Sequence, residues 1–97
     1  MPSYLSLVNW TDQGVRNVKQ SQQRLEAVKQ AVQAAGGRLI FFYMTMGEYD
    51  LATLFEAPDD ETMARVLLSI ASQGNVRTKT LRAFTEDEYR RIIGALP

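Results

Sequence analysis

Asp50 and the phenols of Tyr43 and Tyr49 are the side chains of this sequence best suited to acid–base chemistry. The chain contains no histidine and no cysteine, which excludes a Ser-His-Asp triad, a thiolate nucleophile and the usual ligands of zinc, haem and iron–sulfur centres. Catalysis would therefore use Asp50 as a general base and Tyr43 or Tyr49 as a hydrogen-bond donor, with the Asp50 carboxylate buried. We expect no cofactor and no metal, because helix capping explains the acidic run from Asp59 to Glu61.

The positions of polar and aromatic residues at the ends of the expected strands suggest a ligand-binding site as an alternative to catalysis. The first strand ends at Trp10, the third begins at Tyr49 and Asp50, and the fourth begins near Arg77. In an antiparallel sheet with strand order 4-1-3-2 these ends lie at one edge. We therefore expect a ligand-binding cleft beneath the "TDQG" loop, surrounded by Trp10, Tyr49, Asp50 and Arg77. A structural interpretation stays open, with an Asp50–Arg77 ion pair and a Trp10 side chain in the core or in an interface.

Charge and length restrict the class of partner. The 97 residues carry 11 Lys and Arg against 11 Asp and Glu, so the net charge is zero. Nucleic acid is not an expected partner, because neutralisation of phosphates supplies that affinity. The apolar runs are too short to span a bilayer, and the N-terminus lacks the features of a signal peptide, so we expect no membrane partner and a cytoplasmic protein. The length suits a single domain over residues 1–97.

The hydrophobic pattern predicts four strands and three helices. Gly47 and Glu48 join the second and third strands, Asp59 caps the second helix, and Thr85 with Glu88 forms a capping box for the last one. The expected ranges are 3–10, 22–35, 38–46, 49–57, 60–73, 75–84 and 86 onward. Right-handed β-α-β crossovers then give an α+β, ferredoxin-like βαββαβ sandwich. Its four-stranded antiparallel sheet, in the order 4-1-3-2, carries two helices on one face. A C-terminal helix is added, and its buried side is expected to consist of Tyr89, Ile92, Ile93 and Leu96.

A two-residue type II′ turn at Gly47-Glu48, with a positive φ at Gly47 and Met46 paired with Tyr49, sorts the side chains of the hairpin onto two faces. The more apolar set is expected to face the helices and comprises Ile40, Phe42, Met44, Met46, Tyr49, Leu51, Thr53 and Phe55. The other face still carries Leu39, Phe41, Tyr43 and Leu54. This is more apolar surface than a monomer usually exposes. We therefore expect the same face of a second chain to cover it, in a homodimer or a higher even oligomer. The alternative is that the C-terminal helix folds back over it.

Several motifs together resemble those of the GYD domain family. They are Gly47-x-Tyr49-Asp50, "TDQGVRN", "FEAPDDE", "GNVRTKTLRAF" and "TEDEYRRII", and they cover nearly the whole chain. The resemblance implies a fold of the dimeric α+β barrel superfamily, in which two sheets pack face to face. Relatives in that superfamily include cofactor-free oxygenases, isomerases and ligand-sensing modules. The resemblance implies no established activity, and it singles out only the motif positions Gly47, Tyr49 and Asp50.

Three functions are compatible with these features. The first is a homo-oligomeric small-molecule-binding or sensory module. The second is a cofactor-independent enzyme, oxygenase-like or isomerase-like, acting on a small organic substrate with Asp50 as base. The third is a structural assembly protein without a ligand. A cavity containing Asp50 would favour the enzyme, and a cavity without it would favour the binding module.

Overall fold

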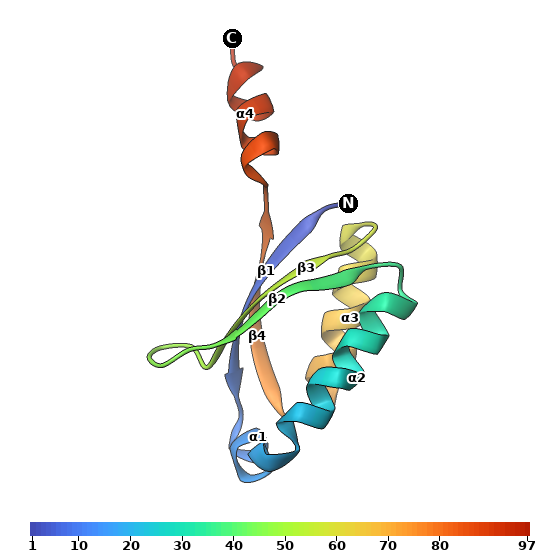
Figure 1. Ribbon diagram of the computed structural model, residues 1–97, viewed down its shortest axis with the longest axis vertical. Coiled ribbons are helices and arrows are strands. Elements are labelled where there is room, and N and C mark those ends of the chain that lie inside the picture. The colour runs from blue at the N-terminus through green and yellow to red at the C-terminus, as the bar shows by residue number, and fades with distance from the viewer.

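The computed structural model describes residues 1–97, and its elements follow the expected order (Figure 1). Their bounds are β1 Ser3–Trp10, α1 Asp12–Arg16, a 3₁₀ turn Val18–Gln20, α2 Ser21–Ala34, β2 Arg38–Met44, β3 Leu51–Glu56, α3 Asp60–Ser72, β4 Val76–Ala83 and α4 Glu86–Gly94. The strands form one antiparallel sheet in the order β2-β3-β1-β4. Helices α2 and α3 lie on one face of it (Figure 1). The predicted α+β class and strand order are confirmed, and this order is consistent with a ferredoxin-like fold.

Local capping signals begin α3 and α4 where the sequence predicts. The Asp59 carboxylate accepts a hydrogen bond from the backbone N–H of Thr62 at 2.8 Å. Thr85 and Glu88 form a reciprocal capping box, with distances of 2.9 Å from Thr85 N to Glu88 Oε1 and 3.1 Å from Glu88 N to Thr85 Oγ1. The hydrogen bond from the Thr85 backbone holds the pKa of Glu88 below its usual value. These bonds satisfy N–H groups that a helix start leaves unpaired. None of the helices combines the length and the hydrophobicity needed to cross a bilayer.

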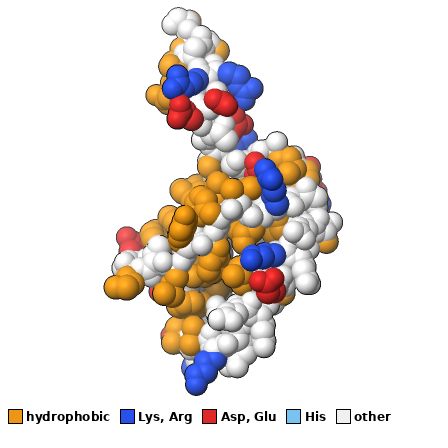
Figure 2. Space-filling view, viewed as in Figure 1, with side chains coloured by type: hydrophobic (Ala, Val, Ile, Leu, Met, Phe, Trp, Pro, Cys, Tyr) orange, Lys and Arg blue, Asp and Glu red, His pale blue; other side chains and the backbone are white.

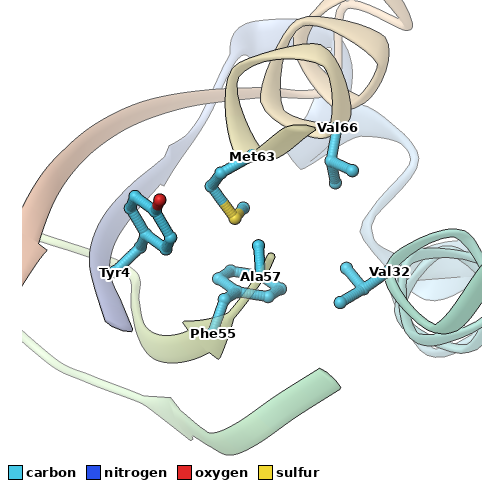
Figure 3. Close-up of a cluster of buried hydrophobic side chains, with 6 residues drawn as sticks. All are labelled: Tyr4, Val32, Phe55, Ala57, Met63 and Val66. Carbon is cyan, nitrogen blue, oxygen red and sulfur yellow. The ribbon is translucent and has the colours of Figure 1, made fainter. Parts of the chain in front are cut away.

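The core is small and lies between the sheet and the helices α2 and α3. It consists of Tyr4, Val32, Phe55, Ala57, Met63 and Val66 (Figure 3). Only 13 of the 97 residues are buried. Many apolar side chains are therefore at least partly exposed in a single chain, which leaves apolar surface without a cover.

The Tyr4 side chain joins β1 to α3 and β4 at the edge of this core. Its hydroxyl donates to Asp60 Oδ1 at 2.5 Å. The same Asp60 oxygen lies 3.9 Å from Arg82 Nε, and the Arg82 guanidinium lies 5.7 Å from the centre of the Tyr4 ring. Burial, and then the hydrogen bond to Asp60, raises the pKa of Tyr4 to about 12.

The raised pKa of Tyr4 predicts a loss of stability in alkali. The folded state holds the Tyr4 proton more tightly than the unfolded state, whose tyrosine pKa is near 10.0. The resulting stabilisation is complete below about pH 10 and is lost as the pH rises through about 12. We expect the Tyr4→Phe variant to be about 1 kcal/mol less stable than the wild type at pH 7, because it lacks the hydrogen bond to Asp60. Between pH 10 and 12, however, its free energy of unfolding should fall less than that of the wild type. Urea denaturation across this pH range measures the free energy of unfolding of both proteins. An equal decrease with pH in the two proteins would contradict the expected role of Tyr4.

A β-bulge at Ile40 changes the predicted sorting of side chains on β2. Leu39 pairs with Phe55 and Phe41 with Leu54, so Ile40 is an extra residue without a partner on β3. Leu39 consequently packs against the core, whereas Ile40 is 42% exposed. The prediction that Ile40 faces the helices and Leu39 the opposite face is therefore wrong. The bulge lets Leu39 and Phe42 reach the same side of the sheet, which strict alternation forbids.

The connection between β2 and β3 is longer than the predicted two-residue turn. The ladder ends at the pair Met44 and Leu51, and Thr45 N donates to Asp50 O at 2.8 Å. The predicted positive φ of Gly47 is confirmed, but its value of 139° is far from the value of about 60° of a type II′ turn. The type II′ assignment and the pairing of Met46 with Tyr49 are therefore wrong. Asp50 is bonded to β1 as well, because its N–H donates to Val8 O at 2.9 Å, so this end of the loop is held by β1 and by Thr45 together.

Helix α4 extends away from the sheet and leaves the face opposite α2 and α3 uncovered (Figure 1). We call this face the open face. The apolar side chains of α4 that the sequence predicts to be buried are exposed in the single chain; they are Tyr89, Ile92, Ile93 and Leu96. The expected burial of these side chains within the chain is therefore wrong, and so is the alternative that the C-terminal helix covers the open face.

Candidate functional site

Asp50 holds the start of the third strand against the end of the first. Its carboxylate Oδ2 accepts a hydrogen bond from Trp10 N at 3.0 Å, and its own N–H lies 3.2 Å from Asn9 Oδ1 in addition to its bond to Val8 O. Asp50 forms no ion pair with Arg77. The residue is therefore used as a hydrogen-bond acceptor for the backbone of β1, which agrees with a structural role but not with the expected counter-charge.

The other predicted site residues spread over two sides of the sheet. Trp10 lines the cavity between the sheet and the helices, whereas Tyr49, Asp50 and Arg77 do not. Arg77 is exposed and pairs with Asn9 across the β1–β4 ladder. Lys79 Nζ lies 5.6 Å from the centre of the Tyr49 ring. The end of the sheet thus brings Trp10 and Asp50 together through a hydrogen bond, but it does not join all four side chains around one cavity.

Tyr43, the other phenol considered for catalysis, lies on the open face. It is 63% exposed, and its ring centre is 5.3 Å from that of Phe41 at an interplanar angle of 48°. Such a tilted aromatic pair adds to an apolar surface. The Tyr43 side chain does not line the sheet–helix cavity.

The sheet–helix cavity is the best-formed concave site of the molecule. It has a volume of about 90 Å³ and is lined by 18 residues from all four strands, from α2 and α3, and from the connection after α3. Eleven of these residues are hydrophobic, among them Leu25, Val28, Phe42, Leu51 and Leu67. No aspartate or glutamate lines it. A concave, largely apolar site with a few polar groups is the usual form of a small-molecule site.

Arg24 on α2 is the charged residue of this cavity. Its Nη1 donates to Asn17 O at 2.9 Å, while its Nη2 is buried and has no acceptor within the protein. Sequence reasoning missed this residue. The available signal was its position on α2, three residues after Ser21 and four before Val28, which places an arginine beside the apolar stripe of the helix.

The "TDQG" segment follows the cavity residue Trp10 and is bonded to the connection between α3 and β4. Thr11 Oγ1 donates to Gly74 O at 2.6 Å, and Gln13 Nε2 donates to Gln73 O and to Asn75 Oδ1, each at 3.0 Å. Gln73 and Asn75 both line the cavity. Helix α1 therefore binds the connection between α3 and β4, which places the segment next to the cavity.

An apolar row crosses all four strands of the open face. Phe41 lies opposite Leu54, Leu54 opposite Leu5, and Leu5 opposite Leu81. A second row beside it contains Tyr43, Ala52 and Leu7. Leu81, on the edge strand β4, is 54% exposed. Figure 2 shows hydrophobic side chains gathered over the middle of the molecule, where the strands lie. The predicted apolar character of this face is therefore confirmed, with Leu5, Leu7 and Leu81 added to it and Leu39 removed.

The hydrogen bond from Trp10 N gives a testable role to Asp50. We expect Asp50→Ala to lower the free energy of unfolding by about 1–3 kcal/mol, because a partly buried N–H loses its acceptor. Asp50→Asn should cost much less, because the side-chain carbonyl of asparagine can still accept that bond. Chemical denaturation at pH 7 compares the three proteins. An Asp50→Asn variant more stable than the wild type would contradict the structural role and would return Asp50 to consideration as a base.

Comparisons with known proteins agree with this architecture. Residues 4–93 match the model of the GYD domain family. A protein of Thermus thermophilus, named glutamine synthetase and cystathionine beta-lyase binding protein, is 36% identical over 84 residues, which cover 86% of this chain and 88% of the relative. The crystal structure of TTHA0845 from Thermus thermophilus superposes with a TM-score of 0.55 at 26% identity, over 88% of this chain and 95% of that one.

Proposed function

Because the chain belongs to the GYD domain family and leaves a whole sheet face uncovered, we propose that it is a homo-oligomeric binding module of the sensory type. In this proposal two copies pack their open faces together, and each copy takes a small molecule in its sheet–helix cavity. The observation that carries the proposal is the apolar row from Phe41 to Leu81 across all four strands.

Assembly through the open face explains the small core of the single chain. Burying each large apolar side chain of the row contributes about 1.5–3 kcal/mol. A two-fold axis through the face would place the row of one copy against the row of the other. The exposed apolar side of α4, which has no counterpart in its own chain, would pack on the second copy. This arrangement is of the dimeric α+β barrel type.

Two observations support a binding role. The cavity is mainly apolar and has a fixed cation, Arg24, at its wall. The similar Thermus protein is named for binding two enzymes, and a sensory module would transmit the presence of a small molecule to partners of that kind. We therefore add protein partners to the small molecule as expected ligands.

The enzymatic alternative has less support. It needs Asp50 as a base next to a bound substrate, but the Asp50 carboxylate is bonded to Trp10 N and does not line the cavity. No other carboxylate lines that cavity. We therefore prefer the binding module to a cofactor-independent oxygenase or isomerase.

A charge placed on the open face should separate the subunits. Leu54 lies in a central strand between Phe41 and Leu5, so Leu54→Lys would put an unpaired ammonium into the middle of the proposed interface. We expect the molar mass, measured by light scattering at micromolar concentration, to fall to that of one chain while circular dichroism still shows a folded protein.

The matched control for this experiment is Leu68→Lys. Leu68 is 70% exposed on α3, away from the open face, and the same substitution there should leave the molar mass unchanged. Dissociation by both substitutions, or by neither, would contradict an interface on the open face.

A further inference from the structure

We propose that the sheet–helix cavity binds a small apolar carboxylate, with Arg24 holding the carboxylate group. This inference rests on the proposed small-molecule binding and specifies the chemical class of the ligand. The cavity of about 90 Å³ limits the size of the apolar body. Apolar protein cavities of about 150 Å³ take up benzene, so this smaller one has room for about four carbon atoms.

The sign of the ligand charge follows from the charged groups of the cavity. Arg24 lines it and no aspartate or glutamate does. An arginine keeps its charge throughout the physiological pH range. Arg24 is partly buried and has no counter-charge in the cavity, so an anion there is favoured over a neutral or cationic molecule of the same shape.

The hydrogen-bonding state of Arg24 indicates where the anion binds. Its Nη1 is held by Asn17 O at 2.9 Å, which fixes the guanidinium, while the buried Nη2 has no acceptor within the protein. A buried N–H donor is expected to have a partner. The Ser21 hydroxyl, one helical turn earlier, belongs to a residue that also lines the cavity. A carboxylate has acceptor sites for both groups, and arginine matches its planar geometry.

The apolar part of the ligand would lie against the hydrophobic residues of the cavity. Leu25 and Val28 continue the α2 side of the cavity beyond Arg24, and Phe42 and Leu51 form its floor on the sheet. Contact with these side chains would remove the body of the ligand from water. The site therefore selects a molecule with one carboxylate at one end and a compact hydrocarbon at the other.

The test compares acids with their amides. The probes are 3-methylbutanoate and butanoate, each against its primary amide, which has a similar shape but no charge. Trp10 is the one tryptophan of the chain and lines the cavity, so its fluorescence reports binding of 3-methylbutanoate at this place, and calorimetry measures the affinity of all four probes. We expect the acids to bind at least about tenfold more tightly than the amides.

Substitutions on α2 test whether Arg24 causes the preference for the acid over the amide. In Arg24→Gln the acid and the amide should bind equally, and Arg24→Lys should retain part of the preference. Lys29→Gln removes a positive charge from the same helix outside the cavity and should change nothing. The comparison of acid with amide on the wild type stands even if Arg24→Gln does not fold.

The outcomes separate this inference from the proposed function. Equal binding of acid and amide by the wild type would overturn the carboxylate assignment but keep a small-molecule cavity. Binding of neither class, with no change in Trp10 fluorescence or melting temperature, would overturn both the carboxylate assignment and the small-molecule role. The molar mass of the assembly remains a separate test in each case.

Discussion

Replacing Gly14 by alanine should lower the free energy of unfolding by about 2–4 kcal/mol, although alanine is the better helix former by about 1 kcal/mol. Gly14 is buried in α1, and a Cβ built there would lie 2.0 Å from the backbone oxygen of Asn75 and 3.3 Å from the Trp10 Cβ. The obstacle is a backbone atom, so no side-chain rotation can relieve the contact. Moving α1 aside would break the hydrogen bond from Thr11 N to Asn75 O, now 3.0 Å long.

The control for this substitution is Gly94→Ala at the end of α4. A Cβ at Gly94 would meet no atom within 4 Å, so the change should be neutral or slightly stabilising by helix propensity. Urea denaturation of both variants measures the contrast. If Gly14→Ala is tolerated as well as Gly94→Ala, then α1 does not pack on the connection between α3 and β4 as described.

Replacing Met63 by alanine should have an effect of similar size. Met63 is 1% exposed, and its side chain points from α3 toward Phe55 and Ala57 in the core (Figure 3). Truncation of a buried methionine costs about 2–5 kcal/mol, because apolar contacts are lost and a cavity remains. The small core has few other side chains that can move in to fill that space.

Leu68→Ala is the matched control on the same helix. It also removes a large apolar side chain, but Leu68 faces solvent on the side of α3 away from the sheet. Its cost should remain below about 0.5 kcal/mol. A large loss for Leu68→Ala at a concentration at which the protein is oligomeric would indicate an interface on the helical side, which contradicts an assembly through the open face.

The parts of the fold that depend on local signals could be predicted from the sequence. The stripe that contains Val28 and Val32 specifies α2, and the Thr85–Glu88 capping box specifies the start of α4. The bulge at Ile40 could not be predicted, because the pairing of Leu39 with Phe55 depends on where two separate strands meet. Likewise, the hairpin loop depends on the bond from Asp50 N to Val8 O, made with a strand far away in the sequence.

The candidate site could be predicted only in part. The sequence places Trp10 at a binding site, and Trp10 lines the cavity. For Arg24, its position beside the apolar stripe of α2 was the one signal, because the bond from Nη1 to Asn17 O and the burial of Nη2 depend on contacts outside the helix. Its Nη2 has no acceptor within the chain, which is a property of the folded structure and not of the residue type.

Sedimentation equilibrium of the wild-type protein over the micromolar range tests the assembly through the open face most directly. The chain mass is 11.0 kDa. Packing of the open faces predicts a molar mass of twice this value, or a higher even multiple, with dissociation only on dilution. A single species with the mass of one chain at every concentration would contradict the proposed homo-oligomer and would leave the row from Phe41 to Leu81 exposed in solution.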